Sequence, residues 1–125
     1  MKTSDYKELQ VWHKAIDLVV EIYKISKLLP KEEVYGISDQ LRRSAVSIPS
    51  NIAEGQSRNS VKEFIQFLSI ARGSLAELET QLLICIKVNM LSEDNIADAQ
   101  NITTEVGKMI KGLMNKLNSQ QTNVC

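Results

Sequence analysis

The sequence of 125 residues has few of the side chains that build catalytic or metal sites. It contains one histidine and two cysteines, whereas a metal site of those ligands needs three or four that converge. It has no phosphate-binding glycine loop, dinucleotide fingerprint or nucleophile elbow. The Glu-x-x-His pattern of di-iron bundles is also missing, because Gln10 stands three residues before His13. We therefore predict a protein that is not an enzyme, holds no metal or cofactor and takes no small-molecule substrate.

Excess charge and long apolar runs are absent as well. Fifteen basic residues balance fifteen acidic ones, whereas proteins that bind nucleic acids or membrane surfaces usually carry a positive excess. No run approaches the roughly 18 apolar residues of a membrane-spanning helix. The first residues lead into an amphipathic segment and not into a signal core. Cys85 lies in an apolar helical run and Cys125 is the last residue, so we expect free thiols and a cytoplasmic location without membrane contact.

Helical periodicity and capping signals predict four helices in one domain, over residues 1–118, followed by a disordered tail at 119–125. The first helix spans about 7–29, with Asp5 as N-cap and Pro30 after its end. The second spans about 36–55 and contains Pro49, which removes one backbone hydrogen bond. The third begins at a capping box, Ser60 to Glu63, and reaches about 89. Ser92 caps the fourth.

The third and fourth predicted helices each carry apolar residues at alternating spacings of four and three. This heptad pattern is typical of left-handed helical bundles. The two seams are Phe64, Leu68, Ala71, Leu75, Leu78, Leu82 and Cys85, and Ile96, Ala99, Thr103, Val106, Ile110, Leu113 and Leu117. Short loops between long helices make neighbours antiparallel. The fold class is therefore all-α, an up-down-up-down four-helix bundle.

The first predicted helix is apolar on two nearly opposite sides, which is more than a bundle helix of a monomer needs. One stripe is Leu9, Trp12, Ile16, Val19, Val20 and Tyr23, and the other is Val11, Leu18, Ile22, Ile25 and Leu29. We predict that the second stripe is an oligomer interface, so that a charged residue at Leu18 or Ile22 yields soluble monomers. The alternative is that the chain ends and the region of Pro49 cover this side within one subunit.

A polar flank accompanies the core stripe of the second predicted helix. It consists of Gln40, Ser44, Ser47, Asn51 and Glu54. Such a flank indicates either a polar pocket or a satisfied network at a helix–helix contact. Nearby Arg42 and Arg43 have two interpretations. They pair with Glu77 and Glu79 of the third helix, or, together with Arg58 and Lys62, they bind the phosphates of a nucleic acid.

Several motifs resemble one known family. The opening run Leu9-Gln10-Val11-Trp12-His13-Lys14-Ala15 is similar to the "L-x-V-W-x-K-A" of the four-helix bundle proteins called 23S rRNA intervening-sequence proteins. The strongest match is Tyr35-Gly36-Ile37 followed by Gln40-Leu41-Arg42-Arg43-Ser44-Ala45-Val46-Ser47-Ile48-Pro49-Ser50-Asn51-Ile52-Ala53-Glu54-Gly55. It continues through Lys62-Glu63-Phe64 to Glu77-Leu78-Glu79-Thr80-Gln81-Leu82.

The resemblance implies a bacterial, ribosomal-protein-like four-helix bundle without catalytic residues and of unsettled biochemical role. This family is similar to the accessory protein of diversity-generating retroelements, a pentameric barrel that binds RNA and a reverse transcriptase. A ring-like homo-oligomer, a pentamer, is therefore the expected assembly. Those RNA-binding relatives are strongly basic, whereas this chain is neutral. Our leading hypothesis is a homo-oligomeric scaffold or adaptor with an unidentified protein partner, and the alternative is an RNA-binding module.

Overall fold

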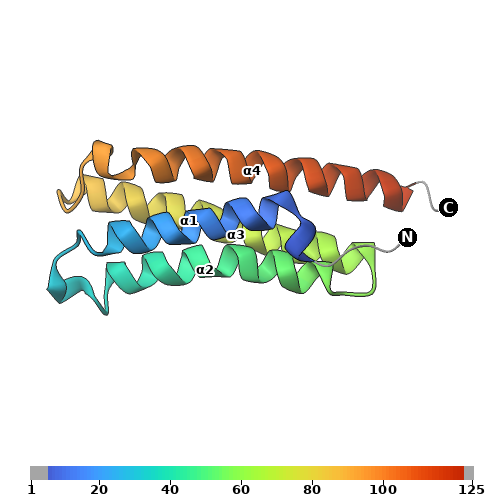
Figure 1. Ribbon diagram of the computed structural model, residues 1–125, viewed down its shortest axis with the longest axis horizontal. Coiled ribbons are helices and arrows are strands. Elements are labelled where there is room, and N and C mark those ends of the chain that lie inside the picture. Colours follow the sequence, from blue (N-terminus) through green and yellow to red (C-terminus); the bar gives the residue numbers. More distant parts are fainter. Residues whose placement is uncertain (1–5, 123–125) are drawn as a thin grey trace.

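The computed structural model describes residues 6–122, and they form four long helices joined by short connections (Figure 1). The helices are α1 (Gln10–Ser26), α2 (Ile37–Gln56), α3 (Val61–Lys87) and α4 (Glu93–Thr122). Two short 3-10 helices, η1 (Tyr6–Glu8) and η2 (Lys31–Glu33), precede α1 and α2. The all-α, up-down-up-down bundle predicted from the heptad seams is confirmed. None of the helices in this range is both long and apolar enough to cross a membrane.

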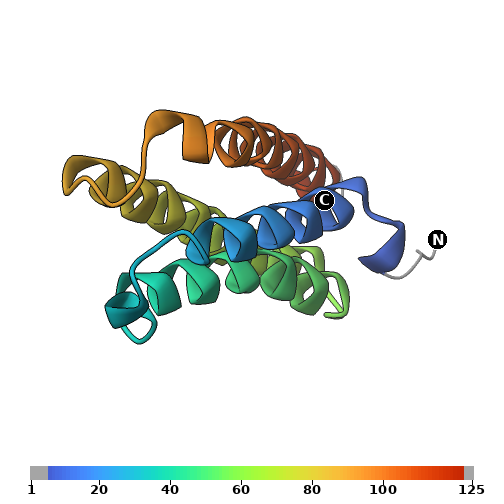
Figure 2. The same cartoon turned by 60° about the vertical axis from the view of Figure 1, so that its left-hand side comes forward.

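The helices form a four-cornered bundle in which α1 and α3 occupy diagonal corners. Each helix packs against its two neighbours around the bundle, and α2 and α3 share the most extensive contact. Within residues 6–122, α1 makes no close backbone contact with α3, and α2 makes none with α4. Figure 2 shows the same arrangement from a second side, with α4 and α2 on opposite edges.

Capping signals placed the starts of α3 and α4 correctly. The hydroxyl of Ser60 accepts a hydrogen bond from the backbone N–H of Glu63 at 3.1 Å, and it donates to the Glu63 carboxylate at 3.2 Å. Ser92 and Asn95 bond reciprocally, because Ser92 Oγ accepts from the Asn95 N–H and Asn95 Oδ1 accepts from the Ser92 N–H. Both arrangements satisfy backbone donors that a helix start leaves unpaired.

We expect Ser60→Ala to lower the free energy of unfolding by about 1 kcal/mol, because the start of α3 loses its side-chain acceptor. Urea denaturation followed by circular dichroism measures this difference. The matched control is Ser69→Ala, at an exposed position within α3 whose hydroxyl bonds to none of the described residues. A control that is destabilised as much as Ser60→Ala would contradict the role of the cap.

The first helix is shorter than predicted. α1 begins at Gln10 after a 3-10 turn and ends at Ser26. Its last turn tightens, because the N–H of Leu28 bonds to the carbonyl of Ile25 at 2.9 Å, and the chain then extends into Pro30. The predicted N-cap, Asp5, lies outside the described residues. By contrast, α2 continues through Pro49 without a break.

The last helix is longer than predicted. α4 extends to Thr122, so a disordered tail beginning at residue 119 is wrong for 119–122. The rest of that segment, 123–125 with Cys125, lies outside the described residues.

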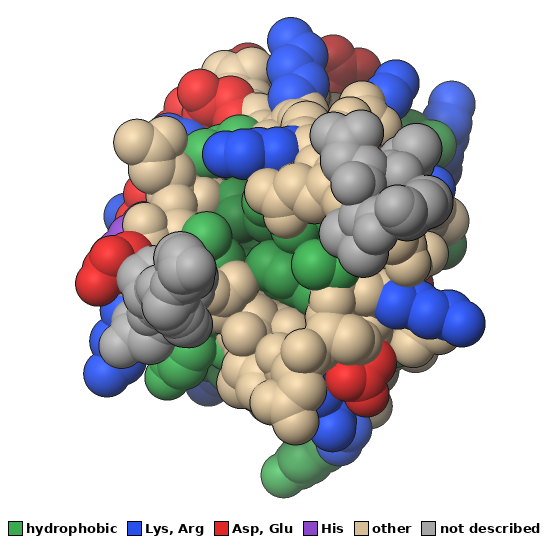
Figure 3. Space-filling view, turned by 90° about the vertical axis from the view of Figure 1, so that its right-hand side faces the viewer, with side chains coloured by type: hydrophobic (Ala, Val, Ile, Leu, Met, Phe, Trp, Pro, Cys, Tyr) green, Lys and Arg blue, Asp and Glu red, His purple; other side chains and the backbone are tan. Residues whose placement is uncertain are grey.

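Cys85 is a free and buried thiol. Figure 3 looks onto the bundle end where α1 begins and α4 ends, and it shows hydrophobic side chains near the centre of this end.

The core contains the predicted seams of α3 and α4, whose residues are buried except for half-buried Leu113, together with Leu41, Ala45, Ile48 and Ile52 of α2. α1 contributes Val11, Ala15, Leu18, Ile22 and Ile25, and Leu29 follows its end. The prediction that this second stripe forms the oligomer interface is therefore wrong. These side chains are at most 7% exposed because they pack against the other helices of the same subunit. Ala15 completes a spacing of four and three that matches the seams of α3 and α4.

Candidate functional site

The surface of α1 opposite the core carries three exposed apolar side chains, which we call the outer stripe. Ile16, Val20 and Tyr23 are 36%, 50% and 44% exposed, and their spacings of four and three place them on one face of the helix. They belong to the first stripe recognised in the sequence. α1 is thus apolar on two opposite sides, as its sequence indicated, but the exposed side is the first stripe and not the second.

A shallow apolar groove borders the outer stripe. It has a volume of about 270 Å³ and lies between α1, α2 and η1. Its lining residues are Tyr6, Trp12, Ile16, Val19, Val46, Pro49, Ser50 and Ala53. The ring of Tyr6 meets that of Trp12 edge-on at 5.3 Å, and His13 Nε2 lies 2.6 Å from the carbonyl oxygen of Lys7. These contacts hold η1 against α1, so the groove is a formed feature of the subunit.

A second exposed apolar set lies on α3. Ile70, Ile84 and Val88 are each about half exposed and share one face of the helix, whereas Leu83 is exposed on another side. We call Ile70, Ile84 and Val88 the α3 patch. Because α1 and α3 occupy diagonal corners of the bundle, the outer stripe and the α3 patch lie on helices that are not in contact.

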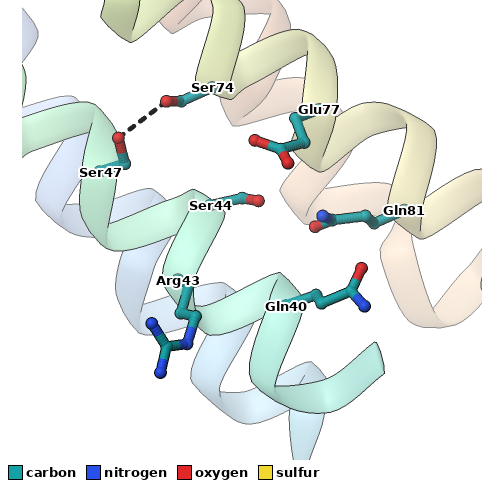
Figure 4. A pocket seen from close by; sticks show the side chains of 7 residues that line it. All are labelled: Gln40, Arg43, Ser44, Ser47, Ser74, Glu77 and Gln81. Atoms are coloured by element: carbon teal, nitrogen blue, oxygen red, sulfur yellow. Dashed lines mark hydrogen bonds between the residues drawn. The ribbon is translucent and has the colours of Figure 1, made fainter. Parts of the chain in front are cut away.

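The polar flank of α2 lies at its contact with α3, and part of it forms a network. Ser47 Oγ and Ser74 Oγ of α3 are 2.8 Å apart, and the Asn51 amide donates to Ser47 Oγ and to the Ser47 carbonyl. Glu54 lies outside this network and binds Arg58. Beside the network is a polar cavity, lined by Gln40, Arg43, Ser44, Ser47, Ser74, Glu77 and Gln81 (Figure 4). Both interpretations of the flank, network and pocket, thus hold for different parts of it.

Arg42 and Arg43 do not pair with Glu77 or Glu79, so that prediction is wrong. Arg43 Nε donates to Asp39 Oδ2 at 2.8 Å, and Arg42 bonds to Ser38 Oγ and to the Val34 carbonyl. Asp39 lies three and four residues before the two arginines, so it meets both from the same helix. Glu79 is exposed and its carboxylate needs no partner.

The four basic residues proposed to bind nucleic acid do not form one patch. Arg42 and Arg43 lie in the first half of α2, and Arg58 follows its end, so about 24 Å of helix separates Arg42 from Arg58. Arg58 binds Glu54 and lies 4.9 Å over the Phe67 ring, and Lys62 is exposed at the start of α3. Three of the four cations therefore already face a carboxylate of their own subunit.

Residues 6–122 contain one cysteine, and its surroundings do not activate it. Burial, and secondarily the nearby carboxylate of Glu33, raise the pKa of the Cys85 thiol, which keeps it protonated and unreactive. The described residues contain no cluster of three or more metal-ligating side chains.

Sequence inspection missed Ser74 and Gln81, two of the three polar residues that α3 contributes to the cavity. Both are buried, and they lie seven residues apart beside the apolar seam of α3. That spacing places them on one line along the helix, facing the serines of α2. The sequence signal that could have revealed these residues is a pair of polar residues seven positions apart on each of two neighbouring helices.

The geometry defines a four-helix bundle protein that presents apolar helix faces and a polar interhelical cavity. A family model described as 23S rRNA-intervening sequence protein matches residues 7–112. The chain belongs to this family, which the sequence motifs had indicated.

One solved structure with a similar fold is a protein of unknown function from the S23 ribosomal protein family of Bacteroides thetaiotaomicron. It is 28% identical, with a TM-score of 0.77, and the match covers 83% of this chain and 97% of that one. No curated protein matches the chain. Neither the family description nor that of the relative names an enzymatic activity.

Proposed function

We propose that this protein is a homo-oligomeric helical scaffold or adaptor, and that the outer stripe of α1 is one of its contact surfaces. The observation that carries this proposal is the exposure of Ile16, Val20 and Tyr23 opposite a core-facing stripe of the same helix. Contiguous exposed apolar residues beside a formed groove are typical of protein–protein contact sites. The groove lined by Trp12, Val46 and Pro49 extends this surface onto α2.

The occupant of this surface is a second copy of the chain, which contributes its α3 patch. Ile84 and Val88 are one turn apart on α3, and Ile70 lies on the same face of the helix about 21 Å away, beyond exposed Glu77. When two different surfaces of identical subunits meet, the contact is heterologous, and it generates a ring if the rotation closes. A ring of five subunits, which the family resemblance favours, is the assembly we propose.

Light scattering after size-exclusion chromatography tests this assembly with two variants. Val20→Asp blocks the outer stripe and Ile84→Asp blocks the α3 patch, and each is expected to convert the oligomer into a folded monomer. The two variants mixed are expected to form a dimer of twice the 14.1-kDa chain mass, because each supplies the surface that the other lacks. Asn101→Asp, exposed on α4, is the matched control and should leave the particle size unchanged.

Each result of this experiment has a clear meaning. A wild-type monomer, or an unchanged oligomer in both variants, would contradict the proposal. If only Val20→Asp dissociated, the α3 patch would not be the surface that meets the outer stripe, and the contact proposed here would be wrong. An oligomer that carries high absorbance at 260 nm would instead favour the RNA-binding alternative, whose affinity should fall steeply with salt.

A further inference from the structure

The polar cavity between α2 and α3 is open to solvent on one side, and one atom in its lining is buried without a hydrogen-bond partner in the described chain. Its volume is about 210 Å³, which corresponds to roughly seven water molecules at about 30 Å³ each. Figure 4 shows Gln40 and Ser44 on the α2 side and Ser74, Glu77 and Gln81 on the α3 side. Ser47 and Ser74 close one end of the cavity through their mutual hydrogen bond.

One polar atom in the lining of the cavity is buried but has no hydrogen-bond partner in the part of the chain that the structure describes. Gln81 is 6% exposed, and its Oε1 is buried without a partner among the described residues. A buried polar group without a partner costs stability, so each instance in a folded protein calls for an explanation. The side chains of Gln40, Ser44 and Glu77 likewise make no hydrogen bond or ion pair within residues 6–122. Four neighbouring polar side chains are thus available to a ligand.

The charge of the cavity favours a cation. Arg43, which belongs to the lining, is paired with Asp39 at 2.8 Å, and Figure 4 shows its guanidinium turned away from the cavity. Glu77 is therefore the charged lining group that has no counter-ion in the described chain. It lies four residues before Gln81 on α3, so its carboxylate and the orphan Oε1 share one side of the helix and both accept hydrogen bonds.

We propose that this cavity binds the guanidinium or primary ammonium group of an organic cation. The cation donates to the Glu77 carboxylate at the rim and to Gln81 Oε1 inside, and Gln40 and Ser44 offer further polar contacts from α2. A planar, multiply donating head group satisfies two acceptors on one helix face at once. The head group can belong to a free small molecule or to an arginine side chain of a protein. The cavity lies within one subunit, but its rim borders the contact proposed above, because Glu77 lies between Ile70 and Ile84 on the same face of α3. The two proposals are therefore tested on the monomeric variant as well as on the wild type.

The test is a titration of the ¹⁵N-labelled full chain, monitored by nuclear magnetic resonance at the side-chain amides of Gln40 and Gln81. Agmatine represents the free cation and N-acetyl-arginine methylamide the arginine side chain, with inorganic phosphate as the opposite charge. We expect saturable shifts at these amides with a Kd on the order of 1 mM or tighter. The cation that binds more tightly identifies the source, and phosphate should shift neither amide.

Variants separate binding from an effect on folding. Glu77→Gln keeps the shape of the side chain and removes its charge, so the affinity should fall about tenfold or more. Glu79→Gln makes the same change at an exposed position outside the cavity, and it should alter the affinity less than about twofold. Gln81→Leu removes the orphan acceptor, so it should abolish the Gln40 shift while the circular dichroism spectrum stays helical.

Three results would overturn the proposal: no saturable shift with either cation, phosphate binding at the same amides, or an equal loss in Glu77→Gln and Glu79→Gln. The Val20→Asp variant keeps this test separate from that of the scaffold. Its cavity is intact and no partner covers the α3 patch beside Glu77, so it should bind the cation at least as tightly as the wild type whether or not the wild type is an oligomer.

Discussion

Replacing Ile22 by aspartate is expected to abolish the folded bundle, whereas Val20→Asp should leave it folded. Ile22 is 0% exposed and lies in the core, while Val20, two residues before it, is 50% exposed. An uncompensated charge in the interior costs about 3–5 kcal/mol, out of a total stability of roughly 5–15 kcal/mol for a domain. An exposed substitution usually changes stability by less than about 0.5 kcal/mol.

Circular dichroism at rising temperature distinguishes the two variants. Ile22→Asp should show weak helical signal or a strongly lowered Tm, and Val20→Asp should melt as a cooperative helical protein. Leu18→Asp, at another fully buried position of α1, should behave like Ile22→Asp. From the sequence alone we expected that a charge at Leu18 or at Ile22 would yield soluble monomers. With the structure, we expect that result from Val20→Asp instead. A well-folded Ile22→Asp would show that the core-facing side of α1 is assigned wrongly.

Gly55→Ala is expected to destabilise the bundle by about 1–3 kcal/mol, because the close approach of α2 and α3 near their connection leaves no room for a methyl group. A Cβ at Gly55 would lie 2.7 Å from Phe67 Cβ and 2.9 Å from Phe64 Cδ1. The first of these atoms is attached directly to the backbone of α3, so the helices must separate to relieve the contact. Urea denaturation measures the loss.

Gly73→Ala provides the matched control for Gly55. Gly73 is also within a helix, but a Cβ there meets nothing within 4 Å. The substitution should therefore stabilise α3 by about 0.5–1 kcal/mol through reduced backbone entropy of the unfolded chain. Opposite signs for the two alanines are the expected result. Two stabilised variants would mean that the contact between α2 and α3 is looser than the structure describes.

Local rules anticipated the helices because their signals act over one or two turns. Ser60 and Ser92 each cap a helix by bonding to a residue three positions further on. The apolar residues in the seams of α3 and α4 follow alternating spacings of four and three. The ends of the chain were harder to place, since the polar residues after 118 continue α4 without an apolar seam to reveal it.

The two stripes of α1 show where this local information ends. Both are rich in large apolar residues, so composition does not decide which of them meets the core. The buried stripe could have been recognised, because Val11, Ala15 and Leu18 begin a heptad spacing like those of α3 and α4, and small Ala15 belongs to it. The packing of α1 between α2 and α4 determines which of the two stripes is buried.

The pairing of the arginines was decided by geometry as well. Opposite charges on α2 and α3 suggested contacts between helices, but Asp39 reaches Arg42 and Arg43 within one turn of α2 and at a smaller entropic cost. Glu77 consequently keeps its charge unpaired at the rim of the cavity.

The sequence by itself determined the four helices, their order and their apolar seams, because capping and periodicity are local properties of the chain, and the resemblance of its motifs indicated the family. The tertiary structure decided which side of α1 is exposed, which carboxylate each arginine meets and where a polar cavity remains. These features depend on which side chains of distant segments meet, and helical periodicity places residues on a face without specifying what that face will contact.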